Sequence, residues 1–113
     1  MERIIEIDGT PVPMKATAST LTRYRAQYGR DLIEDFDALQ KEVNKAQISG
    51  EAIDIFIRLA HTMAKQADKD ITADPWDWVD QFETFPIREI LLPIVSLWSE
   101  SLGMKVEAAE KKE

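Results

Sequence analysis

The sequence predicts an α+β fold that is mainly helical, with an N-terminal β-hairpin packed on a bundle of about five helices. Two patterns carry this prediction. A run rich in β-branched residues ends at Asp8-Gly9, a pair that fits the tight turn of a two-residue hairpin. Beyond residue 18, apolar residues recur at spacings of three and four, which is the period of an amphipathic helix.

The length of 113 residues fits one domain. We expect residues 1–104 to form it, with the hairpin at 3–16. Residues 105–113 should form a flexible charged tail, because the apolar period is lost there. Pro11 and Pro13 occupy alternate positions, so their missing N–H groups can point away from the first strand. Since proline is tolerated in a strand only at a sheet edge, we expect the return strand to lie outermost.

The expected helices have their own start or stop signals. Gly29 follows the end of the first one, and Asp74-Pro75 gives the fourth an N-cap and a proline at its first position. Pro93 should kink the last helix or shift its start. The apolar stripes place the helices at residues 19–28, 32–46, 53–67, 75–85 and 86–102. The core should include Phe36, Phe56, Ile57, Ile90, Leu91 and Ile94.

Composition narrows the classes of function. The net charge is −7, and residues 31–113 carry eighteen acidic side chains against nine basic ones. Nucleic-acid binders gain affinity by neutralising phosphates, so this acidic body argues against nucleic acid as a partner. The absence of cysteine excludes disulfides and thiolate metal sites. The sequence has no apolar run of about 18 residues and no signal-peptide pattern. We therefore expect a cytoplasmic location and no contact with a membrane.

No set of catalytic residues stands out. The single histidine, His61, lacks a metal-binding or triad partner at a suitable spacing, so we interpret it as a helix residue that is hydrogen-bonded locally or exposed. Asp74, Asp77 and Asp80 recur every three residues. Acidic side chains at a helix start are stabilised by the helix dipole, whereas a cation site needs more oxygen ligands held in a loop. We therefore predict a protein that is not an enzyme and that has no metal and no cofactor.

The segment from Arg23 to Arg30 combines arginines with Tyr24 and Tyr28. Arginine on phosphate and tyrosine stacked on bases would bind nucleic acid. A spacing of four also places both tyrosines on one buried helix face, with the arginines paired to the acidic helix that follows. The acidic body favours this structural interpretation.

Three tryptophans are candidate partner-binding residues: Trp76, Trp78 and Trp98. Two of them lie two positions apart on one short helix, so both cannot point fully inward, and one should be partly exposed. Exposed aromatic residues are favoured anchors at interfaces. The alternative is a tryptophan that lies flat beside the hairpin.

These features resemble a known family. The run Ile5–Gly9 and the segment Lys15–Leu32 look like the opening of the tail assembly chaperones of siphophages and of prophages of Gram-positive bacteria. In that family a short hairpin precedes an Arg-Tyr-Arg helix closed by an aromatic-Gly-basic-Asp sequence, here Tyr28-Gly29-Arg30-Asp31. Phe85-Pro86 and the aliphatic last helix are similar to its C-terminal half, so the resemblance covers about residues 3–103.

The resemblance implies a function without catalysis. Members of the family bind the long, hydrophobic, helix-prone tape measure protein in the host cytoplasm before the tail tube polymerises around it, and then leave. The tail tube protein is a second implied partner, and self-association stays open. Helix-in-groove recognition by an acidic helical protein fits this role. Families of this kind also suggest a −1 ribosomal slip, here over the codons of Glu110, Lys111 and Lys112.

A different class of function stays open. A small acidic regulatory protein, such as an antitoxin, an anti-repressor or a nucleic-acid decoy, would also suit the net charge of −7. A decoy should present its carboxylates as one continuous surface, whereas here they alternate with lysines, as at Lys41-Glu42. The neighbouring genes discriminate between the two classes, because a chaperone of this family requires a tail tube gene upstream and a very long tape measure gene downstream.

Overall fold

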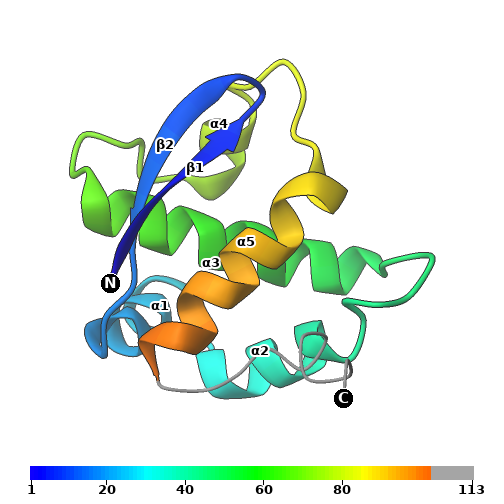
Figure 1. Cartoon of the computed structure of the whole chain (residues 1–113). Coiled ribbons are helices and arrows are strands. Elements are labelled where there is room, and N and C mark those ends of the chain that lie inside the picture. Colours follow the sequence, from blue (N-terminus) through cyan, green and yellow to red (C-terminus); the bar gives the residue numbers. More distant parts are fainter. Residues whose placement is uncertain (103–113) are drawn as a thin grey trace.

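The computed structural model describes residues 1–102 and contains an antiparallel hairpin followed by five helices (Figure 1). The fold is α+β and mainly α, as the sequence predicts. The predicted tail at 105–113, with the codons of the predicted ribosomal slip, lies outside the described residues. The elements are β1 (Glu2–Ile7), β2 (Thr10–Lys15), α1 (Ser19–Tyr28), α2 (Leu32–Gln40), α3 (Gly50–Ala67), α4 (Pro75–Val79) and α5 (Ile87–Ser101).

Asp8 and Gly9 form the turn of the hairpin. Their φ values are positive, 55° and 77°, and Ile7 lies directly opposite Thr10. Positive φ at both central residues is the geometry of a type I′ turn, whose twist matches that of the flanking strands. The local pair Asp-Gly therefore fixes the register of the whole hairpin.

The two prolines of β2 lie where the hairpin needs no N–H group from them. At its open end, Met1 and Ala16 exchange two hydrogen bonds of 2.8 and 2.9 Å. Hydrogen-bonded pairs alternate along an antiparallel ladder, so an N–H group on Pro11 or Pro13 would point away from β1, as predicted. The expectation that β2 lies outermost is wrong. The sheet has two strands, so both are edge strands. β2 packs on α3, and β1 packs on α5.

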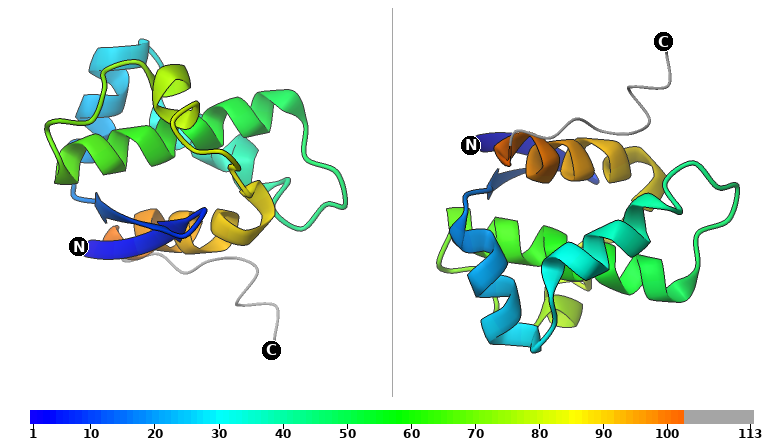
Figure 2. Two further views of the ribbon diagram at one scale, coloured as in Figure 1. Left: turned by 90° about the horizontal axis from the view of Figure 1, so that it is seen from above. Right: turned by 90° about the horizontal axis from the view of Figure 1, so that it is seen from below.

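α3 lies at the centre of the molecule. Figure 2 shows the hairpin and α5 on one side of α3, with α1 and α4 on the other. α2 packs on α3 and reaches α5 through Phe36, whose ring centre lies 6.3 Å from that of Trp98. The predicted core is confirmed, since each of its six members is buried: Phe36, Phe56, Ile57, Ile90, Leu91 and Ile94.

α2 ends at Gln40, well before the predicted end near residue 46. The chain turns back there, so that the Glu42 carboxylate accepts hydrogen bonds from the N–H group and the hydroxyl of Ser49, at 2.8 and 3.1 Å. Ser49 is itself the N-cap of α3. The contact ties the end of one helix to the start of the next, and it replaces the last turn that the apolar stripe predicts.

α4 is also shorter than predicted, ending at Val79. After it, the N–H groups of Gln81 and Phe82 donate to carbonyls three residues back, a spacing that belongs to tight turns. α5 runs unbroken through Pro93, so this proline does not set the start of the helix. Within residues 1–102, no helix is both long and apolar enough to cross a membrane.

Candidate functional site

The segment Lys15–Leu32 forms α1 and the start of α2. Gly29, with φ of 67°, ends α1, and its N–H group donates to the Arg25 carbonyl at 2.8 Å. Asp31 begins α2, because its Oδ1 accepts from the N–H group of Ile33 at 3.0 Å. A left-handed glycine followed so closely by an N-cap reverses the chain within a few residues. The two helices consequently pack against each other, with one face towards α3 and another towards solvent.

The face towards α3 holds a polar cluster, named here the Asp35 cluster, in which three side chains surround a carboxylate that is only 5% exposed. The Tyr24 hydroxyl donates to Asp35 Oδ2 at 2.7 Å. Arg30 donates to both carboxylate oxygens, from Nε at 2.7 Å and from Nη2 at 2.8 Å. Arg58 Nη2 lies 3.7 Å from Oδ2, and Arg58 Nε donates to the Tyr24 hydroxyl at 3.2 Å.

The pKa values in this cluster follow from these contacts. Burial by itself would raise the pKa of Asp35, but hydrogen bonds from Arg30 and Tyr24 outweigh it and lower that pKa below its usual value. Burial raises the pKa of the Tyr24 hydroxyl well above its usual value. The hydrogen-bonded Asp35 carboxylate raises the pKa of Arg30. The ionised carboxylate is therefore stable at neutral pH, and its hydrogen bonds join α1, α2 and α3.

The structural interpretation of the Arg23–Arg30 segment is confirmed for its tyrosines. Tyr24 is fully buried and Tyr28 is half-buried, with ring centres 5.1 Å apart in an edge-on arrangement. Within the described chain, Arg30 is the one arginine of this segment that pairs with the acidic helix. Arg23 donates to the hydroxyl of Ser19 instead, at 3.1 Å.

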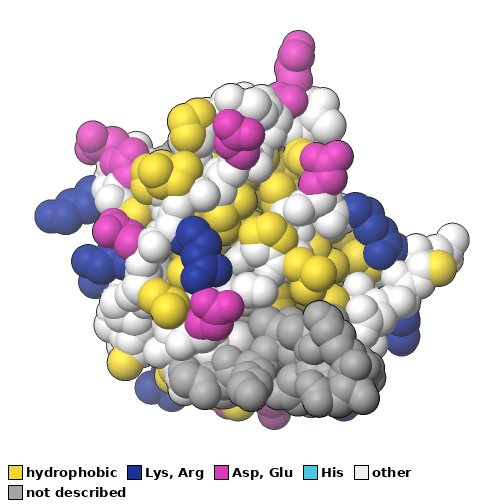
Figure 3. Space-filling model, in the orientation of Figure 1, with side chains coloured by type: hydrophobic (Ala, Val, Ile, Leu, Met, Phe, Trp, Pro, Cys, Tyr) yellow, Lys and Arg dark blue, Asp and Glu magenta, His cyan; other side chains and the backbone are white. Residues whose placement is uncertain are grey.

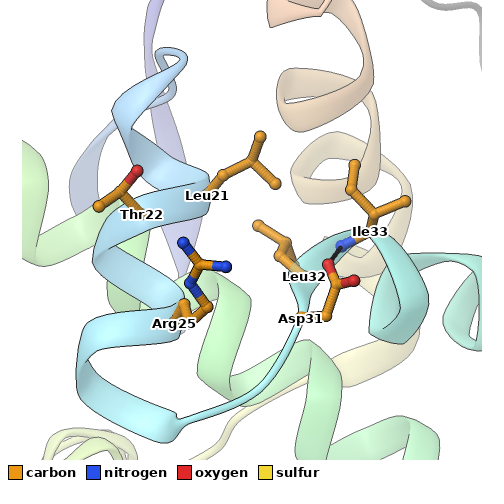
Figure 4. Close-up of a pocket in the computed structure, with 6 residues that line it drawn as sticks. All are labelled: Leu21, Thr22, Arg25, Asp31, Leu32 and Ile33. Carbon is orange, nitrogen blue, oxygen red and sulfur yellow. Dashed lines mark hydrogen bonds between the residues drawn. The ribbon is translucent and has the colours of Figure 1, made fainter.

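The opposite, solvent-facing side of the pair has a hollow of about 240 Å³, named here the α1–α2 hollow (Figure 4). Leu21 of α1 and Ile33 of α2 extend into it from its two sides, and the buried Leu32 lies between them. Ile33 is 52% exposed. The α1–α2 hollow is lined by Leu21, Thr22, Arg25, Asp31, Leu32 and Ile33.

Two opposite charges stand beside this apolar surface. Arg25 comes from α1 and Asp31 from the start of α2, and both are exposed. Neither forms an ion pair with another side chain among residues 1–102. At about 240 Å³, the hollow is smaller than the roughly 300–1,000 Å³ of small-molecule pockets. It suits an apolar side chain of a partner protein, with room for a charge on either side.

Sequence reasoning did not find this hollow. The signal was the pair Leu32-Ile33, in which two large apolar residues follow each other at the start of a helix. Neighbours in a helix point about 100° apart, so a single packed face rarely covers both. Leu32 is 1% exposed, and Ile33 is the residue left outside.

The structure separates the three candidate tryptophans. Trp78 and Trp98 are buried, at 1% and 0% exposure, so their prediction as partner-binding residues needs correction. Trp78 packs edge-on against His61 at 5.7 Å, and Trp98 packs against Phe36. Trp76 is 44% exposed and remains a candidate. As predicted, the two tryptophans of α4 do not both point inward, because positions two apart lie on different sides of a helix.

The residues considered for chemistry have structural partners. His61 is buried and hydrogen-bonded on both ring nitrogens, to Tyr28 and to Thr72. Asp74 is the N-cap of α4, accepting from the N–H group of Trp76 at 2.8 Å. In the described part of the chain, no three His, Cys, Asp or Glu side chains gather as a metal site would require.

Comparison with known proteins gives no assignment. No family model matches the sequence, and neither a curated protein nor a solved structure matches it significantly. The functional argument therefore depends on the residues and surfaces described above.

Proposed function

We propose that this protein is a non-enzymatic tail assembly chaperone, which binds the tape measure protein in the host cytoplasm and keeps it soluble until the tail tube forms around it. The observation that carries the proposal is the solvent-facing α1–α2 hollow, with the exposed Ile33 at its edge. Its other five lining residues lie in the segment Lys15–Leu32, on which the resemblance to that family of chaperones rests. A binding role of this kind needs an apolar contact surface and no set of catalytic groups.

The chemistry of the hollow describes the segment that would fit it. An apolar side chain of a partner helix would enter between Leu21 and Ile33. An acidic residue on the same helix would meet Arg25, and a basic one would meet Asp31. Residues three or four apart lie on one helix face, so a single amphipathic helix can supply these side chains together.

One such contact is weak. Burying a large aliphatic side chain contributes about 2 kcal/mol, whereas micromolar affinity needs about 8 kcal/mol. Trp76, half-exposed on α4, offers a second anchor. Capture of a very long chain by many copies, each held weakly, would suit a chaperone that must leave when the tail tube protein assembles.

Co-expression tests this proposal. Fragments of the tape measure protein, which the proposal places in a very long downstream gene, are produced with and without this chain, and the soluble amount of each fragment is measured. We expect the wild type to raise that amount for at least one helical fragment, and Ile33→Asp to abolish the effect. An acidic residue in the first turn of α2 suits the helix dipole, so this variant should stay folded.

Ile4→Asp is the matched control, since Ile4 is an isoleucine of β1 that is 66% exposed and lies outside the hollow. It should capture fragments like the wild type. The proposal fails if the wild type leaves every fragment insoluble, or if it retains duplex DNA or a toxin instead. Equal losses in the two isoleucine variants would show that the hollow is not the contact surface.

A further inference from the structure

Residues 68–79 fold back beside α3 and are named the strap here; they comprise the loop that follows α3 and the short helix α4 (Figure 1). The loop part is held mainly by side chains that donate to its backbone carbonyls. These bonds run from Lys65 Nζ to the Lys69 and Ile71 carbonyls at 3.2 and 2.9 Å, from His61 Nε2 to the Thr72 carbonyl at 2.8 Å, and from Gln27 Nε2 to the Ala73 carbonyl at 2.8 Å. The polar attachment of the loop therefore depends on a few side chains of α1 and α3, while Ile71 and Trp78 pack on the core.

His61 is the buried member of this set. The Thr72 carbonyl can only accept a hydrogen bond, so Nε2 of His61 must carry a hydrogen. Nδ1 lies 3.1 Å from the Tyr28 hydroxyl, which donates to it when the ring is neutral. The ring also packs edge-on against Trp78, the buried residue of α4. A single neutral imidazole thus joins α1, α3 and both parts of the strap.

The charges around His61 do not offset a proton on it. Lys65 stands one turn further along α3, and the Arg58 guanidinium lies 5.8 Å from the centre of the Tyr28 ring. Asp74, on the strap, is the nearby acidic group. Burial lowers the pKa of His61 and Lys65 lowers it further, while the Thr72 carbonyl and Asp74 act in the opposite direction; the result lies below the usual value. The pKa of Tyr28 is raised by burial to about 12, so its hydroxyl stays protonated.

We propose that His61 is a proton-operated latch: adding a proton to its imidazole releases residues 68–79 from α3 and exposes Trp78. A charged ring would lie between Tyr28 and Trp78 without water and would force the Tyr28 hydroxyl to turn from donor to acceptor. Once the strap is released, the His61 ring on α3 is hydrated and can hold its charge. The closed strap is thus favoured above the ordinary histidine pKa of about 6.5, and this stabilisation is lost as the pH falls below that value. The inference does not depend on the proposed function.

The chain is suited to a direct test because it has one histidine. NMR titration of the untagged protein reads the pKa of His61 without any need for assignment. Hydrogen exchange is then measured at pH 7.5, 6.5 and 5.5 and corrected for the intrinsic rate. We expect exchange in residues 69–79 to rise on acidification while amides in the middle of α3 keep their protection. Between pH 7.5 and 5.5 the rise should approach but not exceed about tenfold, because the released ring has the ordinary histidine pKa of about 6.5.

Two variants keep the test decisive. In His61→Gln, which cannot gain a proton, exchange in the strap should not change between pH 7.5 and 5.5. Asp74→Asn keeps an N-cap but removes the nearby negative charge that favours a proton on the buried His61 ring, so acidification should raise strap exchange more than in the wild type. The latch is refuted if exchange in the strap is independent of pH in the wild type, or if His61→Gln shows the same pH dependence. Equal acceleration at α3 amides would also refute it, because that would indicate unfolding of the whole domain.

Discussion

The two faces of the α1–α2 pair differ in a way that runs against their surroundings. Towards the protein interior, the pair presents the Asp35 carboxylate and the Tyr24 hydroxyl, which meet Arg58 of α3. Towards solvent, it presents the α1–α2 hollow, with the half-exposed Ile33 at its edge. A simple amphipathic pattern would place these groups the other way round.

The two faces differ in whether their side chains have partners within the protein. In the buried cluster each polar group has a partner within the protein, so the cluster stabilises one particular packing of α1, α2 and α3. On the outer face, Ile33 is 52% exposed, and Arg25 forms no ion pair within the described chain. We attribute stability to the inner face and, on the proposed function, binding to the outer one, and three substitutions can test that division.

Asp35→Ala should have the largest effect. It leaves Arg58 without its ion-pair partner and the buried Tyr24 hydroxyl without its acceptor, and breaking a buried pair in this way costs about 3–5 kcal/mol. Arg30 is partly exposed, with a side-chain exposure of 44%, and can be hydrated, so we expect a loss of about 3 kcal/mol in the free energy of unfolding in urea. Asp37→Ala on the same helix is the control, since its pair with Lys41 is exposed and should contribute less than about 1 kcal/mol. Equal losses would show that the buried cluster is not a special source of stability.

Tyr24→Phe should have an intermediate effect. It keeps the buried ring but removes two hydrogen bonds with ionised groups, one to Asp35 and one from Arg58, and bonds of that kind contribute about 1.5–3 kcal/mol. Since Arg30 still donates to both oxygens of Asp35 and Arg58 keeps its ion pair with Asp35, we expect a loss of about 2 kcal/mol, measured by urea unfolding. Binding of tape measure fragments should be unchanged. A loss of binding without a loss of stability would contradict the division between the faces.

Ile33→Ala should change stability least, by less than about 0.5 kcal/mol, because surface substitutions away from buried groups fall in that range. The same variant should reduce capture of a tape measure fragment. Its matched partner is the adjacent Leu32→Ala, which removes a side chain that is 1% exposed and should cost about 2–5 kcal/mol in urea unfolding. If Ile33→Ala proved as destabilising as Leu32→Ala, the outer face would be part of the core.

Features set by neighbouring residues were the ones that the sequence predicted well. The Asp8-Gly9 turn, the Gly29 helix end and the Asp74-Pro75 helix start depend on residues adjacent in the chain, and the structure has all three. The end of α2 was missed because it depends on a contact between Glu42 and Ser49, seven residues apart. Local propensity does not encode a contact of that length.

The candidate site was predicted less well, for a related reason. The tyrosine spacing predicted a buried face, but the partner Arg58 comes from α3, 34 residues beyond Tyr24 in sequence. The alternation along α4 predicted that one tryptophan would be outside, yet not that it would be Trp76. That choice depends on which side of α4 meets α3. Trp98 was a candidate only by residue type, and its burial follows from packing against α2.

The prolines of β2 limit the addition of a foreign strand to the edge of the hairpin. A foreign strand joining the outer edge of β2 would find no hydrogen-bond donor at Pro11 or at Pro13, so it could not form a continuous ladder there. A protein that handles long apolar chains at high local concentration risks becoming the first layer of their aggregates. The hairpin is therefore a poor template for sheet growth along that edge. This would allow the protein to bind aggregation-prone partners without aggregating with them.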